Sequence, residues 1–476
     1  MIPTKRALAG LALSLGALWG FGGCATLMPQ YVKPGLPVAD NWPSGPAYKG
    51  TAGHSGPAVA EIRWQEFFTD PRLRQLISLA LDNNRDLKMA AINIEKSRAL
   101  YQIQRSDLLP KVEASAASNL QRVPADFESS HQPATIQQDT LGVGISSYEL
   151  DFFGRVRSLK AQALDQYLAT VEARRAAQLS LVSQIAYAYL NLAADRERLR
   201  LAQETLSNQQ AAFKLVTSRC QAGIASDLDL EQAQTSVDAA RLDIARYTTL
   251  TAQDENALNL VAGTKVPAEL LPSSLAETLT ALKDLSPGLP SEVLLSRPDI
   301  LQAEELLKGA NANIGAARAA FFPRITLVSA AGLGSTNLSG LFSSDSFAWS
   351  LTPKLSLPIF DAGANRAGLE VSEADKKLAV ARYEKAIQTA FREVADALAQ
   401  RGTIDEQLAA QQSLADASAK SYQLSQARYG KGVDSYLSVL VSQRALYAAQ
   451  QNLINVRLAR LLNLSALYQV LGGGSV

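Results

Sequence analysis

The chain has 476 residues, 47% of them hydrophobic and 19% charged, and its formal net charge is +1. That charge balance excludes a polybasic nucleic-acid-binding protein and an acidic disordered protein, so nucleic acid is not an expected partner. Two cysteines cannot build a disulfide scaffold, and the two histidines, His54 and His131, lie far from both cysteines in the sequence. The sequence contains no phosphate-binding loop, zinc-protease motif or nucleophile elbow. We therefore expect no metal site and no enzymatic activity.

The N-terminal residues have the pattern of a secretory signal peptide. Two basic residues precede an apolar run over residues 7–21, which is shorter than the roughly 20 residues of a membrane-spanning helix. The small residues before Cys24 resemble a bacterial lipoprotein cleavage site, and Ala25 in place of Asp favours, by the same resemblance, sorting to the outer membrane. We expect residues 1–23 to be removed and Cys24 to carry a covalent lipid, the only cofactor expected. The alternative is an ordinary signal peptide with a chance cysteine.

Residues 24–60 are rich in Pro, Gly and Ala and show little periodicity, which predicts an extended tether rather than a domain. Further along the chain no segment of 18 apolar residues occurs, so no helical membrane span is expected. Cys220 is then the only other thiol, and we expect it to be unpaired and buried.

The sequence contains two similar halves. Asp86 and Pro110 recur at one constant offset as Asp299 and Pro323. Further pairs recur at a second constant offset: Gly154 and Gly363, Arg219 and Arg428, Gly223 and Gly432, Ser226 and Ser435, Leu228 and Leu437, Gln234 and Gln443, and Gly263 and Gly472. Repetition at fixed spacing predicts an internal two-fold duplication of roughly 210 residues. We place the copies at residues 61–263 and 296–472, with a linker over residues 264–295.

Each copy predicts the same order of elements. The first has a helix that starts at Asn83 and ends before Pro110, strands over residues 111–120 and 139–152, a long helix over 155–220 and a return helix over 226–262. The second has a helix from Ser296 to before Pro323, strands over 324–335 and 346–360, a long helix over 364–429 and a return helix over 435–470. Acidic residues three positions after Asn83 and Ser296 predict capping boxes there. Gly223 and Gly432 break the chain before the return helices, whose predicted N-caps are Ser226 and Ser435.

Apolar residues recur every seven positions along the first long helix, at Ile185, Leu192, Leu199, Leu206 and Phe213. A seven-residue repeat predicts coiled-coil-like packing against neighbouring helices. About 66 residues extend about 100 Å in a helix, whereas a typical globular helix has roughly 8 to 20 residues. The length therefore favours a long helical assembly over an ordinary amphipathic helix of a soluble bundle.

The predicted strands have one apolar face. In residues 346–360 the large apolar residues are at odd-numbered positions, among them Phe347, Trp349, Leu351 and Leu355. Alternate positions of a strand face the same side of the sheet. Each segment has about ten residues, as in a transmembrane barrel strand, although a soluble sheet packed on helices is the alternative. Four strands cannot close a barrel, for which about eight is the minimum. Membrane strands would therefore require several copies sharing one barrel, because an open edge is not viable in lipid; this arithmetic does not select three.

Several segments together carry a family resemblance. They are Cys24, the segment Ile-Arg-Trp-Gln-Glu-Phe-Phe at 62–68, Arg-Pro-Asp-Ile at 297–300, Ala-Ala-Arg-Ala-Ala-Phe-Phe-Pro at 316–323, and the Arg-x3-Gly-x2-Ser-x-Leu signatures that start at Arg219 and Arg428. With these segments the chain resembles the TolC/OprM family of outer-membrane efflux channels over nearly its whole length. It is most similar to the OprM-like lipoproteins of resistance-nodulation-division multidrug efflux systems.

The resemblance implies a mixed membrane protein. Three copies would share a 12-stranded transmembrane β-barrel, four strands from each, continuous with a long periplasmic α-helical barrel and a small mixed equatorial domain. The implied function is the passive exit duct of a tripartite efflux pump for drugs and other small toxic molecules. The implied partners are a periplasmic adaptor protein, an inner-membrane resistance-nodulation-division transporter and outer-membrane lipids. The alternatives are an exit duct for type I protein secretion and a periplasmic coiled-coil lipoprotein scaffold without a pore.

The resemblance also implies a gate. The hairpins at Gly223 and Gly432 would form the periplasmic tip. Leu437 matches the family's aperture leucine, but Val441 stands where an aspartate is expected, so the ring would gate by sterics and dewetting. The acidic residues Asp227, Asp229, Glu231 and Asp434 are alternative sources of charge, or simply solvated first-turn acids. The ties that hold related channels closed resemble, by position, Asp195, Arg401, Tyr429 and Arg444, unless these are ordinary solvated side chains of a bundle.

Overall fold

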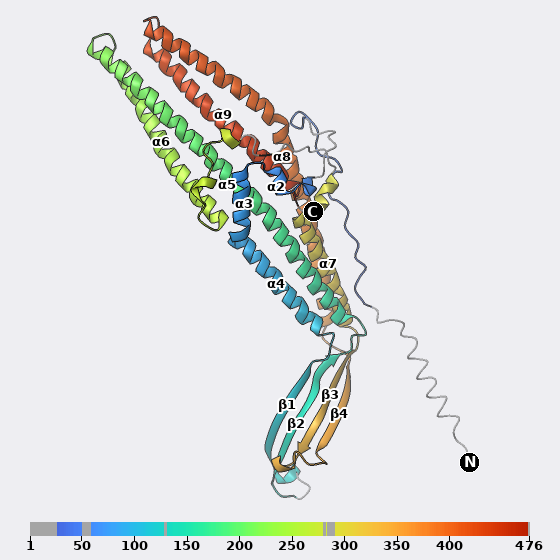
Figure 1. The fold of residues 1–476 in the computed structure, drawn as a ribbon. Coiled ribbons are helices and arrows are strands. Elements are labelled where there is room, and N and C mark those ends of the chain that lie inside the picture. Colours follow the sequence, from blue (N-terminus) through green and yellow to red (C-terminus); the bar gives the residue numbers. More distant parts are fainter. Residues whose placement is uncertain (1–25, 50–58, 128–130, 279–281, 283–290, 475–476) are drawn as a thin grey trace. The chain divides into compact units, whose positions relative to one another are not determined.

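The computed structural model describes residues 26–49, 59–127, 131–278, 282 and 291–474 (Figure 1). The chain divides into two compact units. One contains the described residues within 1–34, 94–170 and 303–383, and the other those within 35–93, 171–302 and 384–476. Cys24, the predicted lipid site, lies outside the described residues, as do the predicted signal peptide and His54.

Helices and strands follow one another in the same order in the two halves (Figure 1). After the short helices η1 (Val59–Glu61) and α2 (Trp64–Phe67), the first half contains α3 (Pro71–Asn83), α4 (Arg85–Ser106), β1 (Val112–Val123), η2 (Ala125–Phe127), β2 (Ala134–Glu149), α5 (Arg155–Gln221) and α6 (Asp227–Ala262). Three short 3-10 helices follow, η3 (Ala268–Leu270), η4 (Ala276–Thr278) and η5 (Ser291–Ser296). The second half contains α7 (Pro298–Ala319), β3 (Arg324–Ser335), η6 (Leu338–Gly340), β4 (Phe347–Ser356), α8 (Ala364–Gly430) and α9 (Tyr436–Val470). In the described part of the chain no helix has the length and apolar character needed to cross a membrane.

The starts of α4 and α7 differ from the expected ones. Asn83 is the last residue of α3, and its side chain donates to the Leu79 carbonyl at 2.8 Å. The cap of α4 is instead Asn84, whose Oδ1 accepts from the Leu87 amide at 2.9 Å. The Ser296 hydroxyl bonds back to Val293 inside η5, so it does not cap α7. The predicted capping boxes at Asn83 and Ser296 are therefore wrong, because both side chains are used by the preceding helix.

The four strands form one antiparallel sheet in the order β1-β2-β3-β4. The register shifts between Ile145 and Tyr148 of β2, where the sequence alternation also changes phase. β4 contains Pro353, which lies opposite Leu327 of β3 and has no amide to donate to a neighbouring strand. The outer strands β1 and β4 each have only one neighbour in the sheet, so each leaves one edge unpaired within the described chain.

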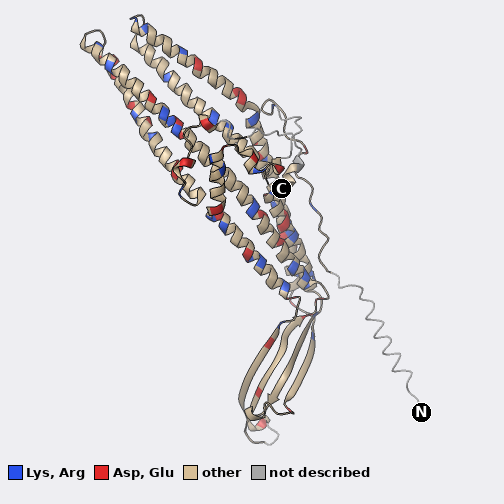
Figure 2. Ribbon diagram, viewed as in Figure 1, with Lys and Arg blue, Asp and Glu red and all other residues tan. Residues whose placement is uncertain are grey.

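The register sorts the side chains into an apolar and a polar face. One row across the sheet aligns Trp349, Ala331, Val143 and Ala114, and the adjacent row aligns Ser350, Ala330, Gly144 and Glu113. Because successive side chains point to opposite faces, the first row shares its face with other apolar rows and the second with small and polar ones. Trp349 is 71% exposed on the apolar face. Charged residues are sparse along the strands (Figure 2).

A buried aromatic and ionic core holds the second unit. The rings of Phe67 and Tyr468 stack with centroids 4.3 Å apart, which joins α2 to the end of α9. Tyr189 of α5 donates to Asp70, the N-cap of α3, at 2.8 Å. Arg297 donates to the Val470 carbonyl at 2.7 Å, and its guanidinium lies between the carboxylates of Asp299 and Glu393 at 2.7 and 3.0 Å. These contacts fix the residues from which the long hairpins extend.

The N-terminal segment docks on α7 within the first unit. The Asn311 amide donates to the Pro29 carbonyl at 2.8 Å, and Lys33 forms an ion pair with the buried Glu304 at 2.7 Å. A Cβ atom on Gly315 would lie 2.8 Å from the Cα of Met28, so glycine is needed for this close approach. The described start of the predicted tether is therefore extended and held along a helix.

Candidate functional site

Two hairpin turns join the long helices to the return helices. Gly223 and Gly432 adopt left-handed φ angles of 75° and 70°, which glycine adopts without steric cost. The Ile224 amide donates to the Arg219 carbonyl at 2.8 Å, and the Val433 amide donates to the Arg428 carbonyl at 3.0 Å. The two turns thus close the ends of α5 and α8 with the same hydrogen-bond pattern.

The two return helices start differently. Ser226 forms a full capping box with Asp229 at the start of α6. Ser435 occupies the N-cap position of α9, but its side chain makes no capping hydrogen bond. The N-cap position predicted for Ser435 is therefore confirmed. The residue three positions on is Ser438, which has no carboxylate to reach back and complete a capping box.

The acidic residues at the turns have local partners. Asp434 accepts from Arg428 at 2.6 and 2.8 Å, and these hydrogen bonds hold its pKa below the usual value. Asp227 lies 3.3 Å from the Cys220 sulfur, and this hydrogen bond raises the pKa of the Cys220 thiol. Cys220 is partly exposed and unpaired, so the expectation of a buried thiol is wrong. It is the penultimate residue of α5, next to the turn at Gly223.

An apolar cluster packs the two hairpins against each other. Arg219 of the first hairpin lies over the Tyr429 ring of the second, 4.7 Å from its centroid, and Tyr429 also contacts the Tyr436 ring at 5.4 Å. The buried members come from α5, α6 and α9: Val216, Ala233, Tyr436, Val439 and Leu440. The two hairpins therefore meet through a shared core near their turns.

Leu437 and Val441 lie outside this core. They are one helical turn apart on α9 and are 54% and 61% exposed, whereas Tyr436 and Leu440 beside them are buried. Leu228, at the matching position of α6, is 65% exposed. The chain thus presents apolar side chains on the faces of its return helices that its own core does not cover.

A ladder of polar contacts, which the sequence did not reveal, joins the return helices. Tyr447 donates to Asp243 at 2.8 Å, and one turn further Gln451 donates to the Tyr247 hydroxyl at 3.2 Å. Burial and the hydrogen bond to Asp243 raise the pKa of Tyr447, which keeps its hydroxyl a neutral donor. The only signal in the sequence is a polar pair, spaced one turn apart, on each return helix.

The structure does not bring the four expected gate ties together. Asp195 pairs with Arg198 of its own helix, and Arg401 pairs with Asp405 at 2.6 Å, also on its own helix. Tyr429 contacts Arg219, and Arg444 is exposed. Asp195 has a second acidic neighbour, Asp254 of α6, whose pKa is raised to about 6, first by burial and then by Asp195.

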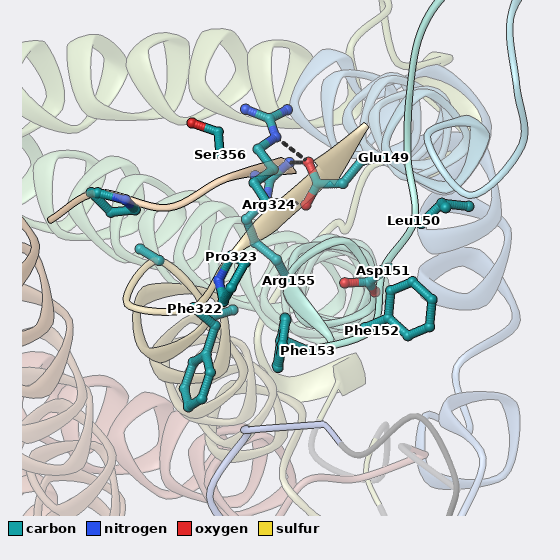
Figure 3. Close-up of a pocket in the computed structure, with 13 residues that line it drawn as sticks. Glu149, Leu150, Asp151, Phe152, Phe153, Arg155, Phe322, Pro323, Arg324 and Ser356 are labelled. Carbon is teal, nitrogen blue, oxygen red and sulfur yellow. Dashed lines mark hydrogen bonds and ion pairs between the residues drawn. The ribbon is translucent and has the colours of Figure 1, made fainter. Parts of the chain in front are cut away.

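A cavity of about 360 Å³ lies where the strands of the first unit join α5 and α7 (Figure 3). Its charged side is Glu149, which accepts from Arg155 at 2.8 and 2.6 Å and pairs with the Nε of Arg324 at 2.7 Å. Its apolar side contains the stacked rings of Phe153 and Phe322, with centroids 4.7 Å apart. In the described residues, no three His, Cys, Asp or Glu side chains are grouped as metal ligands.

Comparisons with known proteins agree on one family. A family model described as outer membrane efflux protein matches residues 76–264 and 289–473. The probable efflux pump outer membrane protein TtgC of Pseudomonas putida is 46% identical over 469 residues, which cover 98% of this chain and 96% of that protein. The outer membrane protein OprJ of Pseudomonas aeruginosa is 43% identical over 464 residues, which cover 98% and 94%.

Solved structures have the same fold. A crystal structure of a membrane protein from Pseudomonas aeruginosa is 41% identical and superposes with a TM-score of 0.88, covering 94% of this chain and 100% of that one. The open state of the MtrE outer membrane channel of Neisseria gonorrhoeae is 36% identical, with a TM-score of 0.85 and coverage of 94% and 98%.

Proposed function

The chain belongs to the outer membrane efflux protein family, and from this premise we propose that it is the outer-membrane exit duct of a tripartite efflux pump. Three copies share a 12-stranded barrel across the outer membrane, and the long helices of the two duplicated halves form a periplasmic helical barrel. A periplasmic adaptor protein and an inner-membrane transporter of the resistance-nodulation-division type complete the pump. The duct is passive, has no enzymatic activity, and depends on its partners for energy.

The two-faced sheet with open edges is the observation that carries the proposal. The apolar face, with Trp349 71% and Phe347 65% exposed, suits contact with lipid, and the small and polar face suits a water-filled lumen. Unpaired edges at β1 and β4 are not tolerated in lipid, because their backbone groups lack partners there. Pairing β4 of one copy with β1 of the next closes the sheet and leaves no edge.

The hairpins at Gly223 and Gly432 form the periplasmic tip that contacts the adaptor. Leu437 and Val441, exposed on α9, line the aperture with apolar side chains, so the gate excludes solutes by sterics and dewetting. Asp434 and Asp229 stabilise their own hairpins, as their contacts within the turns support. A lipid on Cys24 adds a second attachment to the outer membrane.

The substrates are small toxic molecules. Relatives include a solvent efflux pump protein and toluene efflux pump proteins of Pseudomonas putida, and an antibiotic efflux pump protein. We extend this class, apolar solvents and antibiotics, to the present chain. Selection among them belongs mainly to the transporter, since a passive duct conducts whatever is delivered to it.

Conductance in a planar lipid bilayer tests the duct. The purified full-length protein is expected to insert and give discrete conductance steps, with chemical cross-linking that stops at trimers. A scaffold without a pore gives no steps, and this outcome would overturn the proposal. A duct for protein secretion also conducts, but deletion of its gene would abolish export of a protein and leave drug accumulation unchanged.

A further inference from the structure

The two edge strands of the sheet carry opposite charges on the same face. The charged residues of β1 are Glu113 and Arg122, and β4 has a single charged residue, Lys354. Glu113 belongs to the row across the sheet that contains Ser350, and Lys354 lies four positions further along β4. Because alternate residues of a strand share a face, Glu113 and Lys354 both lie on the small and polar face, whereas Arg122 lies on the apolar one.

Both charges lie at the end of the sheet nearest the helices. Glu113 is the second residue of β1, which follows α4, and Lys354 is the third residue from the end of β4, which leads to α8. Both residues are exposed, and neither has a hydrogen-bond or ion-pair partner among the described residues. Glu149 and Arg324, at the same end of the sheet, pair with each other. Each open edge therefore presents one unpartnered charge, and the two charges have opposite signs.

We propose that Glu113 of one copy forms an ion pair with Lys354 of the next copy at each seam of the barrel, where β4 of one chain meets β1 of another. The proposal rests on the proposed duct, in which these two edges pair. Opposite charges on facing strands are stabilising, and like charges directly opposite are destabilising. Charge complementarity fixes the register of two partners more than their affinity. The ion pair therefore selects the register at which the sheets of the three copies close.

The tilt of barrel strands brings the two side chains together. Membrane-barrel strands are tilted by about 35–45°. Over four strands about 4.8 Å apart, with a rise of about 3.3 Å per residue, this tilt offsets the next copy of β1 by about four to six residues. Since Glu113 shares a row with Ser350, the offset places it opposite Lys354 or opposite Ser356, the diagonal neighbour of Lys354. An offset in the other direction would place Glu113 beyond Phe347, where β4 begins.

Cysteine cross-linking of the full-length protein tests the contact. The test variant carries Glu113→Cys and Lys354→Cys in a Cys220→Ser background, and the reagent is a bifunctional thiol cross-linker with a short spacer. We expect covalent dimers and trimers on a denaturing gel. The matched control carries Asn119→Cys in place of Glu113→Cys. Asn119 lies on the same face of β1, six positions further from the helices, so the control is expected to stay monomeric.

The outcomes separate this contact from the duct itself. Cross-linking of the wild type with an amine-reactive reagent shows whether the chain forms trimers, and their absence would contradict the duct and the ion pair together. Wild-type trimers, with no thiol cross-link in a Glu113/Lys354 cysteine variant that still conducts, would overturn only the ion pair. Cross-linking through Asn119 as strong as that through Glu113 would show a different register and would overturn it as well.

Charge reversal tests whether the contact is electrostatic. Glu113→Lys or Lys354→Glu alone places like charges at every seam, and either is expected to lower the fraction of trimer that survives mild heating in detergent by at least about twofold. The double reversal restores opposite charges and is expected to return this fraction to near the wild-type value. A double variant with no more trimer than either single variant would overturn the ion pair.

Discussion

The Tyr447 hydroxyl donates a hydrogen bond of 2.8 Å to the Asp243 carboxylate, and so ties α9 to α6. This contact and the Gln451–Tyr247 rung beside it join the two return helices, which belong to different halves of the chain. If the aperture widens by separation of these helices, both rungs must break. The ladder is then a polar connection that favours the closed state, beside the four ties expected by position.

Tyr447→Phe is expected to favour opening. The substitution removes a hydrogen bond to a charged acceptor, which typically stabilises by about 1.5–3 kcal/mol. We expect more frequent or longer openings in planar bilayers, and greater uptake of a large antibiotic by cells that carry the variant. Tyr101→Phe is the matched control, because Tyr101 stacks on Tyr167 and its hydroxyl has no hydrogen-bond partner among the described residues. Equal effects of the two substitutions would show that the ladder does not hold the gate.

Replacing both Leu437 and Val441 with Ala is expected to raise conductance. Smaller side chains widen an apolar constriction and make it easier to wet. Leu242→Ala provides the control, because Leu242 is also a largely exposed leucine of a return helix, with 70% of its surface accessible. Conductance equal to the wild type in the double variant would place the constriction elsewhere.

Val441→Asp is expected to make the channel more cation-selective. A ring of carboxylates at the constriction attracts cations and repels anions, whereas the present valine has no charge. The reversal potential under a potassium chloride gradient measures the change. Asp238→Asn, an exposed acid of α6 paired with Arg241, controls for general surface charge. An unchanged reversal potential in Val441→Asp would contradict a position in the narrowest part of the path.

Gly432→Ala is expected to destabilise the second hairpin, and Gly430→Ala is not. A Cβ atom added to either glycine would have no other atom within 4 Å, but only Gly432 has a left-handed φ, 70°. A non-glycine residue in that conformation costs about 1–2 kcal/mol, whereas Ala in place of a helical Gly is favourable by up to about 1 kcal/mol. Limited proteolysis after Lys431 reports the difference. Equal cleavage of the two variants would contradict this explanation of the turn.

Stability is expected to rise as the pH falls from 7 toward 4, as far as Asp254 contributes. Its pKa is raised to about 6 by burial and by Asp195, so the folded protein binds a proton that the unfolded chain releases at its ordinary, lower pKa. Above about pH 6 Asp254 is ionised in the folded protein, and the free-energy cost of its buried charge then lowers the stability in full. Asp254→Asn should therefore raise the melting temperature at pH 8 and flatten the pH dependence between about 4 and 6. A lower melting temperature at pH 8 would mean that the ionised carboxylate is stabilising.

The elements with strong periodicity were predictable from the sequence. The long helices and β3 lie within about one residue of the expected bounds, because apolar repeats and the glycines at 223 and 432 mark them. β4 ends at Ser356 rather than near residue 360, since Pro358 has no amide to donate to a ladder. β2 begins at Ala134 rather than 139 because β1 supplies backbone partners for residues that show no hydrophobic signal.

The contacts between distant segments were not predictable. The Asp243–Tyr447 rung and the Glu149–Arg324 pair each join residues from different halves of the chain. The first pair shows only the one-turn spacing of two polar residues on each return helix, and the second shows no motif. Neither signal identifies a partner, because a single polar residue on a helix or strand end is usually solvated. Asp195 and Arg401, two of the residues matched by position to the ties of related channels, have partners one turn away on their own helices. Their role as gate ties stays a prediction.

Antibiotic and dye accumulation in a strain that lacks this gene, with and without the restored wild-type gene, measures whether the chain takes part in export. If the chain is the exit duct of an efflux pump, accumulation is higher in the deletion strain and returns to the original level on complementation. The Leu437→Trp variant should complement less well than the wild type if Leu437 lines the aperture, because the larger side chain would fill it. Unchanged accumulation after deletion, in a strain without a second channel of this family, would contradict an export function.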